Sequence, residues 1–380
     1  MEATAPVPLT DTPTHHTSGA ERNILVIGGG IAGCSVARAL AERGWDVMLL
    51  TRAVTDGASG NAAAVLFPQL SKRWLPSTAW NFAAEDFSRR LYTSLQILGA
   101  QTLIESPGIL RLPRHEAEAA ALRQINDALG LDAAIVRWVE ANEASEQAGV
   151  ALTTGAAFLP QGSWVNPVAL CANLLQHPRI QVRAGVAVRR LVREGAGWRA
   201  HAVNGEDFYS AQMCLANGFE AAALLPVPLA LSATAGQVST LSADQVAAPL
   251  RSILCHKGYV IPLGTGYLIG ATYDREDLSG RVTEENHQKN ASEVAQFLPG
   301  WMTGPATEGR TSLRATTPDR LPYVGQLEPG LWLSLGHGSR GMISAPLAAE
   351  IIASKLSGEM PPVGPELYRV VDPQRMLTHR

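Results

Sequence analysis

The stretch Asn23–Gly33, which reads NILVIGGGIAG, decides the expected fold of this 380-residue chain. The apolar run Ile24–Ile27 is typical of a strand that is buried on both faces. The residues that follow, to about residue 43, have the apolar spacing of a helix, and Val47–Leu50 predicts a second buried strand. These elements make up one β-α-β unit, so the sequence predicts an α/β domain that begins at Asn23.

The glycines between the first strand and the helix match the spacing G-x-G-x-x-G. Gly28 suits a tight turn, Gly30 lets a pyrophosphate approach the backbone, and Gly33 lets the helix pack closely against the strand. The helix N-terminus adds free N–H groups and a positive dipole. This context predicts a dinucleotide site, in preference to a turn that is merely tight.

Two positions near this unit depart from the usual dinucleotide pattern. Thr51 and Arg52 stand where an acidic residue would hold the ribose hydroxyls. Thr51 can still bond a ribose, whereas Arg52 leaves a 2′-phosphate, and therefore NADP, open. A second match at Gly336–Gly341 has too little chain after it for another β-α-β unit, so it indicates a Gly-rich turn that lets a flat ring approach the backbone.

The composition narrows the class of protein. A hydrophobic content of 46% with 17% charged residues excludes a mainly disordered or fibrous protein. The net charge of −3 provides no overall basic field for nucleic acid. The 4 cysteines and the histidines show no metal-ligand spacing, so we expect reduced core thiols and no metal. No apolar run reaches the ~18 residues of a membrane span and no signal peptide is visible, so we expect a cytoplasmic protein without a membrane anchor.

Alternating α/β and β-rich stretches predict an α/β fold in which a Rossmann-like nucleotide domain is interleaved with a mixed α+β substrate domain. Outside the first unit, helices are expected over residues 78–98, 116–129, 284–297 and 345–356. The expected division is a disordered tail or linker remnant at 1–22, the nucleotide domain at 23–77, 150–230 and 310–360, the substrate domain at 78–149 and 231–309, and a C-terminal tail at 361–380.

Further motifs carry a family resemblance. They are Trp164-Val165-Asn166-Pro167, Leu215-Ala216-Asn217-Gly218, Leu313-Arg314 and Pro322-Tyr323-Val324-Gly325. Together with the glycine loop, they resemble the FAD-dependent amine and amino-acid oxidases of the D-amino-acid oxidase and glycine oxidase superfamily. The resemblance implies a D-amino-acid oxidase-like fold and FAD as the dinucleotide.

A second set of runs resembles one subfamily. The runs are Gly57–Asn61, Pro68–Lys72, Gly236–Val238, Gly338–Gly341 and Ser344–Leu347. They are similar to the oxidoreductase half of bifunctional enzymes that modify the wobble uridine of tRNA. That resemblance implies tRNA as the substrate partner: a carboxymethylaminomethyl group is oxidised, glyoxylate leaves and aminomethyluridine remains. The methyltransferase half has no counterpart in this sequence, so we expect a separate methyltransferase as a further partner.

The resemblance also implies the substrate-binding residues. A substrate carboxylate is best held by the bidentate fork of an arginine, and Arg314 matches the family position with that role. The alternative for Arg314 is a structural ion pair with Asp319. Arg340, in the Gly-rich turn, is a second candidate, and Tyr259 resembles a site-lining tyrosine, with a packed core aromatic as the alternative.

The cofactor contacts implied by the resemblance gather around the two glycine-rich loops. They are Gly28, Gly29, Gly30, Gly33, Thr51, Ser59, Gly60, Asn61, Val186, Gly338, Ser339 and Gly341. The N-terminus of helix 345–356 is expected to face the flavin's carbonyl edge, where its dipole favours the anionic reduced ring. His337 is expected to be a loop histidine without a catalytic role.

Two other functions stay open at the level of sequence. One is a small-molecule glycine or secondary-amine oxidase, which a small lidded pocket would favour. The other is a catalytically silent flavoprotein partner of a separate methyltransferase. A basic rim around an open cleft would favour the tRNA enzyme, and the pair Lys72-Arg73 is one candidate for that rim.

Overall fold

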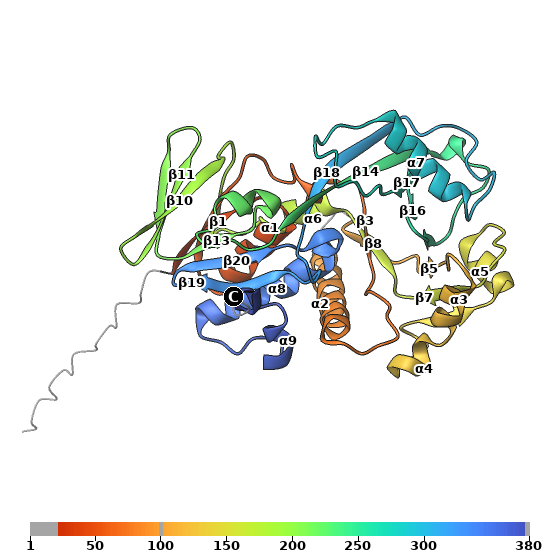
Figure 1. The fold of residues 1–380 in the computed structure, drawn as a ribbon, viewed down its shortest axis with the longest axis horizontal. Helices are drawn as coiled ribbons and strands as arrows, with labels where there is room; N and C mark the ends of the chain where they lie inside the picture. The colour runs from red at the N-terminus through yellow and green to blue at the C-terminus, as the bar shows by residue number, and fades with distance from the viewer. Residues whose placement is uncertain (1–21, 99–101, 377–380) are drawn as a thin grey trace, which may run out of the picture.

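The computed structural model describes residues 22–98 and 102–376. The predicted N-terminal tail, apart from Arg22, lies outside the described residues. Within them, the chain forms two large β-sheets with helices packed on their faces (Figure 1). The predicted α/β fold class is confirmed.

The first large sheet has six strands in the order β19-β20-β13-β1-β2-β9. All neighbouring pairs are parallel except β19–β20, which is antiparallel. The apolar run predicted to be a doubly buried strand is β1, and the predicted second strand pairs with it in parallel, which confirms the β-α-β unit. The bounds are β1 Asn23–Ile27, β2 Asp46–Leu50, β9 Ile180–Arg183, β13 Met213–Leu215, β19 Tyr323–Glu328 and β20 Leu331–Leu335.

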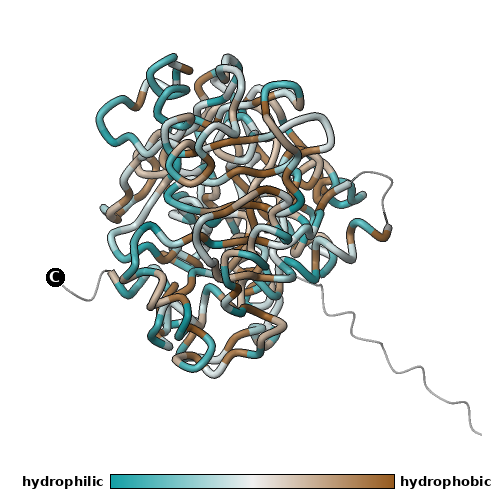
Figure 2. The backbone as a smooth tube through the Cα atoms, turned by 90° about the vertical axis from the view of Figure 1, so that its right-hand side faces the viewer, coloured by the Kyte–Doolittle hydropathy of each residue, from teal (hydrophilic) through white to brown (hydrophobic). Residues whose placement is uncertain are grey.

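Helices and a small sheet cover this six-stranded sheet, so that hydrophobic segments run through the interior (Figure 2). One face packs against α1 Ile31–Ala41, α2 Pro76–Leu98, α6 Pro167–Leu174 and α8 Gly341–Ser357. The other face packs against the antiparallel sheet of β10 Val188–Glu194, β11 Gly197–Ala202 and β12 Asp207–Ser210.

Helix α8 begins earlier than the sequence predicts, at residue 341 instead of 345, and it continues through Pro346. A proline inside a helix leaves the carbonyl four residues before it without its N–H partner. Here the Tyr92 hydroxyl donates to that Met342 carbonyl at 2.6 Å, and the Ser88 hydroxyl donates to the Ile343 carbonyl at 2.7 Å. Side chains of α2 thus satisfy the first turns of α8, which is why the proline does not set the helix boundary.

The second large sheet has eight strands in the order β18-β14-β17-β16-β15-β5-β7-β6. Helix α7, Glu284–Ala295, packs on one face of it. The bounds of the strands are β5 Ile109–Arg111, β6 Arg137–Val139, β7 Ala156–Leu159, β14 Ser232–Ser242, β15 Ile253–Cys255, β16 Tyr259–Leu263, β17 Gly266–Gly270 and β18 Glu308–Thr316. A three-stranded sheet of β3 Ala64–Leu66, β8 Ser163–Val165 and β4 Ile104–Glu105 lies beside the two.

The single helix predicted over 116–129 is wrong in detail. The structure has α3 Glu116–Arg123 and α4 Ile125–Leu129, because the backbone of Gln124 leaves helical geometry at φ −93° and ψ 3°. The remaining short elements are α5 Ala141–Ala148, α9 Pro365–Arg369, and the 3-10 turns η1 Ala58–Gly60, η2 Gly218–Ala223, η3 Ala243–Gln245, η4 Gly338–Arg340 and η5 Pro373–Met376.

Two segments bear on the proposed division into domains. Helix α2 packs against α8 beneath the six-stranded sheet, although its residues fall in the predicted substrate part. Residues 361–376 fold back onto β19, where the Val324 N–H donates to the carbonyl of the fully buried Val371 at 2.8 Å. The predicted boundaries therefore remain a proposal. In the part of the chain that the structure describes, no helix is long and apolar enough to cross a membrane.

Candidate active site

The glycine loop between β1 and α1 is shaped by two positions where only glycine fits. Gly28 has φ +120°, and a Cβ on it would lie 2.5 Å from the Ala216 carbonyl oxygen. A Cβ on Gly33 would lie 1.9 Å from the Gly28 carbonyl oxygen. The loop therefore turns tightly beside β13, and α1 packs directly against it, as the glycine spacing predicts.

The middle of the loop leaves room for a ligand at Gly30. A Cβ on Gly30 would meet only the Ser59 side chain within 4 Å, with the hydroxyl at 3.2 Å. Ser59 accepts the N–H of Ile31, at the start of α1, at 2.9 Å and keeps its own O–H to donate. Gly29 faces Thr51, whose Oγ1 would lie 2.6 Å from an added Cβ. The start of α1 thus presents N–H groups and a hydroxyl without an acidic residue in its first turn, which suits an anion.

Thr51 and Arg52, which replace the expected acidic residue after β2, have different surroundings. Thr51 is buried, its hydroxyl donates to the main-chain carbonyl two residues on at 2.8 Å, and its own carbonyl accepts the N–H of Val186 at 3.0 Å. Arg52 is instead engaged in ion pairs with Asp56 at 3.0 Å and Glu220 at 2.7 Å. A 2′-phosphate would have to compete with two carboxylates for Arg52.

Asn217 Oδ1, at the end of β13, and Trp164 Nε1, on β8, are among the buried polar atoms that lack a hydrogen-bond partner among the described residues. The Cα of Asn217 lies 2.8 Å from the position of a Cβ on Gly28, so this side chain stands next to the glycine loop. Burying an unpaired donor or acceptor costs about 1–3 kcal/mol. A ligand that offers both donors and acceptors would recover that cost.

The loop over residues 55–61 is fastened by Arg310, a residue that the sequence did not single out. Its Nη2 donates to the carbonyls of Asp56 at 2.8 Å and Gly57 at 2.7 Å, and its Nη1 donates to Asn61 Oδ1 at 3.2 Å. A Cβ on Gly60 would lie 2.6 Å from Arg310 Nη2. One sequence signal could have pointed to Arg310. It lies two strand periods before Arg314, and residues at that spacing share one face of a strand.

Arg314 lies across β14 in a space that a glycine provides. A Cβ on Gly236 would lie 2.3 Å from Arg314 Nη2, and Arg314 Nη1 donates to the Thr272 carbonyl at 3.4 Å. Within the described residues no carboxylate lies within 4.0 Å of this guanidinium. The predicted alternative, an ion pair with Asp319, is wrong, because Asp319 pairs with Arg375 at 2.9 Å. Arg314 is thus half-buried with an uncompensated charge, the condition in which it binds a carboxylate well.

Tyr259 and Arg340 carry groups whose protonation is shifted by burial. Burial raises the pKa of Tyr259, although the positive charge of Arg314 opposes the shift. Burial lowers the pKa of Arg340, and the charge of Arg320 adds to that effect. Tyr259 is therefore a neutral phenol near Arg314, on a strand that pairs with β17 and β15.

His337 fastens the Gly-rich turn between β20 and α8. Its Nε2 lies 3.0 Å from Ser334 Oγ and its Nδ1 lies 2.7 Å from Ser344 Oγ. Ser344 in turn donates to the Arg340 carbonyl at 2.9 Å, so Nδ1 is the nitrogen that carries the proton in this network. Burial lowers the pKa of His337 to about 4, so the ring is neutral at ordinary pH. This histidine holds the turn over Gly338–Gly341 in shape.

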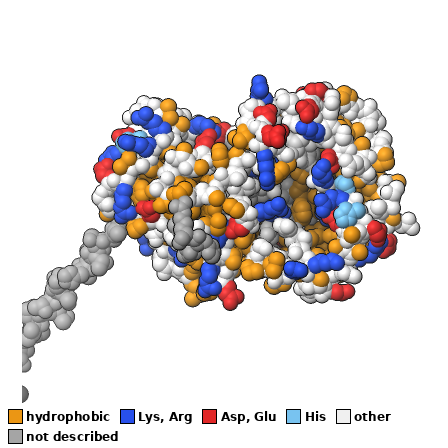
Figure 3. All heavy atoms as spheres, viewed as in Figure 1, with side chains coloured by type: hydrophobic (Ala, Val, Ile, Leu, Met, Phe, Trp, Pro, Cys, Tyr) orange, Lys and Arg blue, Asp and Glu red, His pale blue; other side chains and the backbone are white. Residues whose placement is uncertain are grey.

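Strand β18 brings the two groups of predicted residues together. Near its start, Arg310 reaches the loop beside the first glycine motif, and near its end Thr316 bridges to His337 at the second motif. Arg314 lies between these points. The space-filling view shows a hollow between the two halves of the molecule, with Lys and Arg side chains along its border (Figure 3).

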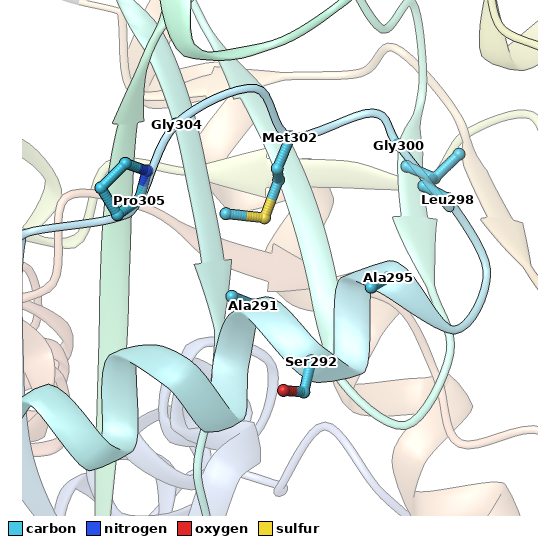
Figure 4. Close-up of a pocket in the computed structure, with 8 residues that line it drawn as sticks. All are labelled: Ala291, Ser292, Ala295, Leu298, Gly300, Met302, Gly304 and Pro305. Atoms are coloured by element: carbon cyan, nitrogen blue, oxygen red, sulfur yellow. The ribbon is translucent and has the colours of Figure 1, made fainter.

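A separate cavity of about 350 Å³ lies between α7 and the loop 298–305 (Figure 4). It is lined by Ala291, Ser292, Ala295, Leu298, Gly300, Met302, Gly304 and Pro305, without a charged side chain. Helix α7 packs on the face of β14 that carries Gln237 and Ser239, opposite to the face of Gly236. This cavity is therefore not part of the candidate site. In the described ranges no group of three His, Cys, Asp or Glu residues could hold a metal ion.

Comparisons with known proteins agree on one family. Residues 23–355 match the family model described as DAO, FAD dependent oxidoreductase. The tRNA 5-methylaminomethyl-2-thiouridine biosynthesis bifunctional protein MnmC of Azoarcus sp. (strain BH72) is 36% identical over 95% of this chain and 61% of its own length. The protein of the same name from Paraburkholderia phytofirmans is 33% identical over 94% of this chain and 60% of its own length. The chain thus spans about 60% of the length of these curated relatives.

Solved structures share the fold at lower identity. Glycine oxidase from Geobacillus kaustophilus superposes with a TM-score of 0.81 at 22% identity, covering 93% of this chain and 99% of that chain. Iminodiacetate oxidase from Chelativorans sp. BNC1 gives a TM-score of 0.79 at 21% identity, covering 90% of this chain and 97% of that chain. Both likenesses cover nine tenths or more of this chain and concern its fold.

Proposed function

The chain belongs to the family of FAD dependent oxidoreductases, and from this premise we propose that it oxidises the carboxymethylaminomethyl group on the wobble uridine of tRNA. The reaction converts the secondary amine into an imine, and water then splits the imine. Glyoxylate leaves, and aminomethyluridine remains on the tRNA. The observation that carries the proposal is the uncompensated, half-buried guanidinium of Arg314, in a chain whose curated relatives are named for tRNA modification.

The residues around the first glycine loop fit FAD. The open side of Gly30, the N-terminus of α1 and the Ser59 hydroxyl would hold the pyrophosphate. Thr51 and the main chain at Val186 would hold the adenosine part, and the orphaned Asn217 Oδ1 would gain a partner. When bound, FAD supplies the acceptor for the two electrons that leave the C–N bond.

Arg314 would hold the carboxylate of the substrate's glycine-like arm through its bidentate fork. The neutral Tyr259 phenol nearby can donate a hydrogen bond without adding negative charge. Positive charge from Arg314 and Arg340 disfavours protonation of the substrate amine, because like charges repel in a partly buried site. A neutral amine is the form whose C–N bond can be oxidised, so these arginines would both orient the arm and keep its nitrogen reactive.

The name of the relatives includes a further activity. Because the relatives are bifunctional proteins of which this chain matches about 60%, we propose a methyltransferase as a partner that acts on the product. The oxidation proposed here does not depend on that partner, so it can be tested with the isolated chain.

The experiment mixes the FAD-loaded protein anaerobically with tRNA that carries carboxymethylaminomethyluridine. We expect loss of the oxidised-flavin absorbance and release of glyoxylate, with much slower reduction by free glycine or sarcosine. Arg314→Met should slow reduction by the modified tRNA and leave the FAD content unchanged. Efficient turnover of glycine without a response to the modified tRNA would favour a small-molecule oxidase. No reduction by either substrate would favour a silent flavoprotein.

A further inference from the structure

An exposed aromatic side chain and an arginine extend the site outward from Arg314. Thr272, whose carbonyl accepts from Arg314, is followed by Tyr273, which is 57% exposed. The segment is fixed in place, because the N–H and carbonyl of Asp274 bond the carbonyl and N–H of Ala235 on β14 at 2.9 and 2.7 Å. The chain from 272 to 275 therefore runs from the Arg314 guanidinium to the exposed surface beside it, which we call the mouth of the site.

The Tyr273 ring is accompanied by a guanidinium. The Cζ of Arg275 lies 5.5 Å from the ring centroid, and its Nη2 donates to the Tyr273 hydroxyl at 3.5 Å. The hydrogen bond from Arg275 and the charges of Arg275 and Arg320 lower the pKa of the Tyr273 phenol. The ring is thus flanked by positive charge and has a large part of its surface open to solvent.

Arg320 is held at this mouth by an unusual backbone. It has φ +62°, a left-handed conformation that disfavours side chains other than glycine. The turn is nevertheless fixed, because the Arg320 N–H donates to the Thr317 carbonyl at 3.2 Å and the Leu321 N–H donates to Asp319 Oδ1 at 3.1 Å. Asp319 is itself paired with Arg375. A backbone conformation that favours glycine thus presents an arginine.

The three positive groups at and behind the mouth have no carboxylate partner within 4.0 Å in the part of the chain that the structure describes: Arg275, Arg320 and Arg340. The charge of Arg320 acts on both Arg340 and Tyr273, so it lies close enough to interact with both groups. Two acids of the neighbouring loop are turned to its own backbone: Asp274 accepts the N–H groups of the residues that follow it, and Asp277 accepts the N–H of Ser279. Glu276 is left as an exposed acid of that loop.

We propose that Tyr273, Arg275 and Arg320, the mouth cluster, form a contact surface for single-stranded RNA, in which Tyr273 stacks on an unpaired base beside the modified uridine and the two guanidinium groups neutralise adjacent phosphates. The proposal rests on the proposed function, which makes an anticodon loop the substrate. Aromatic rings beside arginines bind unpaired nucleotides because every base has a face to stack and every nucleotide has a phosphate. A substrate of the size of glycine has one carboxylate, which Arg314 alone would hold, so it has no use for two further guanidinium groups.

The first test measures binding of an unmodified anticodon stem–loop RNA to the FAD-loaded protein over a series of salt concentrations. Arg320→Gly removes the guanidinium and gives the left-handed position its preferred residue, so the fold should be retained. We expect about tenfold weaker binding and a salt dependence reduced by about one phosphate contact. Tyr273→Leu should weaken binding to a similar degree with an unchanged salt dependence, because stacking carries no counterion. Arg190→Ala, on the distant exposed face of β10, is the matched control and should change neither quantity.

The second test compares flavin reduction by the modified stem–loop and by the modified nucleoside, which has no phosphate. Arg320→Gly should lower kcat/KM for the stem–loop about tenfold and leave the nucleoside reaction unchanged. Equal RNA affinity and equal salt dependence in wild type and Arg320→Gly would refute the proposed RNA-binding role of the mouth cluster, even if the wild type oxidises the modified RNA. Weakened RNA binding in the variant, without any flavin reduction by modified RNA in the wild type, would refute the proposed function and support the mouth cluster.

Discussion

Gly236→Ala should displace Arg314 without disturbing the fold. The added methyl would lie 2.3 Å from Arg314 Nη2 and 2.5 Å from its Cζ, whereas ordinary van der Waals contact begins at 3.4 Å. The guanidinium must therefore move by about 1 Å or more, and a misplacement of that size can cost about 100-fold in rate. Gly236 has no positive φ, so alanine is compatible with the strand, and the colliding atoms are the far end of a flexible side chain. We expect kcat/KM for flavin reduction by substrate to fall about 100-fold.

The assay is anaerobic stopped-flow reduction of the FAD-loaded protein by tRNA with carboxymethylaminomethyluridine, together with FAD content and thermal unfolding. Gly264→Ala is the matched control, because an added Cβ there meets nothing within 4 Å. The double variant Gly236→Ala with Arg314→Met should be no slower than Arg314→Met alone, since both changes remove one interaction. A Gly236→Ala protein that is reduced at the wild-type rate would show that the position of Arg314 does not matter to the reaction.

Four further changes test other parts of the structure. Gly30→Leu should give a folded protein that purifies without flavin, measured by absorbance, because the side chain would occupy the space for the pyrophosphate; normal flavin content would contradict this. Arg310→Met should weaken FAD binding in a fluorescence titration, since the carbonyls of the loop 55–61 lose their donor; an unchanged Kd would mean that the loop holds its shape unaided. Tyr92→Phe should lower the free energy of unfolding in urea by about 1–3 kcal/mol, because the Met342 carbonyl is left unpaired; equal stability would indicate another donor. Because the pKa of His337 falls from 6.5 to about 4 on folding, folding favours the neutral ring, so its contribution is present above pH 6.5 and lost as the pH falls toward 4; His337→Gln should lose less stability than wild type across that range, and parallel curves would contradict the assignment.

The first β-α-β unit could be predicted from sequence because its signals are local. The apolar run of β1, the glycine spacing and the second strand all lie within one stretch. The close contacts that require glycine are made within that stretch or with the end of β13. The role of Arg314 in holding a substrate carboxylate stays a prediction that rests on the resemblance, since nothing in the local sequence pattern says what a strand arginine binds.

The features that the sequence missed depend on partners far along the chain. Arg310 bonds atoms of residues about 250 positions before it, and the Arg375–Asp319 pair spans 56 positions. The early start of α8 depends on Tyr92, which satisfies a carbonyl 250 positions away. A hydrogen bond of this kind depends on how two elements pack against each other. The local sequence around either residue therefore does not predict it.

Strand β18 fixes the distance between Arg310, which holds the loop over residues 55–61, and Arg314, the proposed substrate-binding residue. Arg310 and Arg314 stand on one face of it, four residues or about 13 Å apart, with the register to β14 continuous from Ser232 to Thr240. Because one hydrogen-bonded strand sets both positions, a shift that suits a new substrate would also pull on the loop over residues 55–61. In related enzymes with other substrates, we therefore expect sequence changes in the segments that follow the strands, residues 271–281 after β17 and residues 317–320 after β18. The length of β18 itself should stay constant.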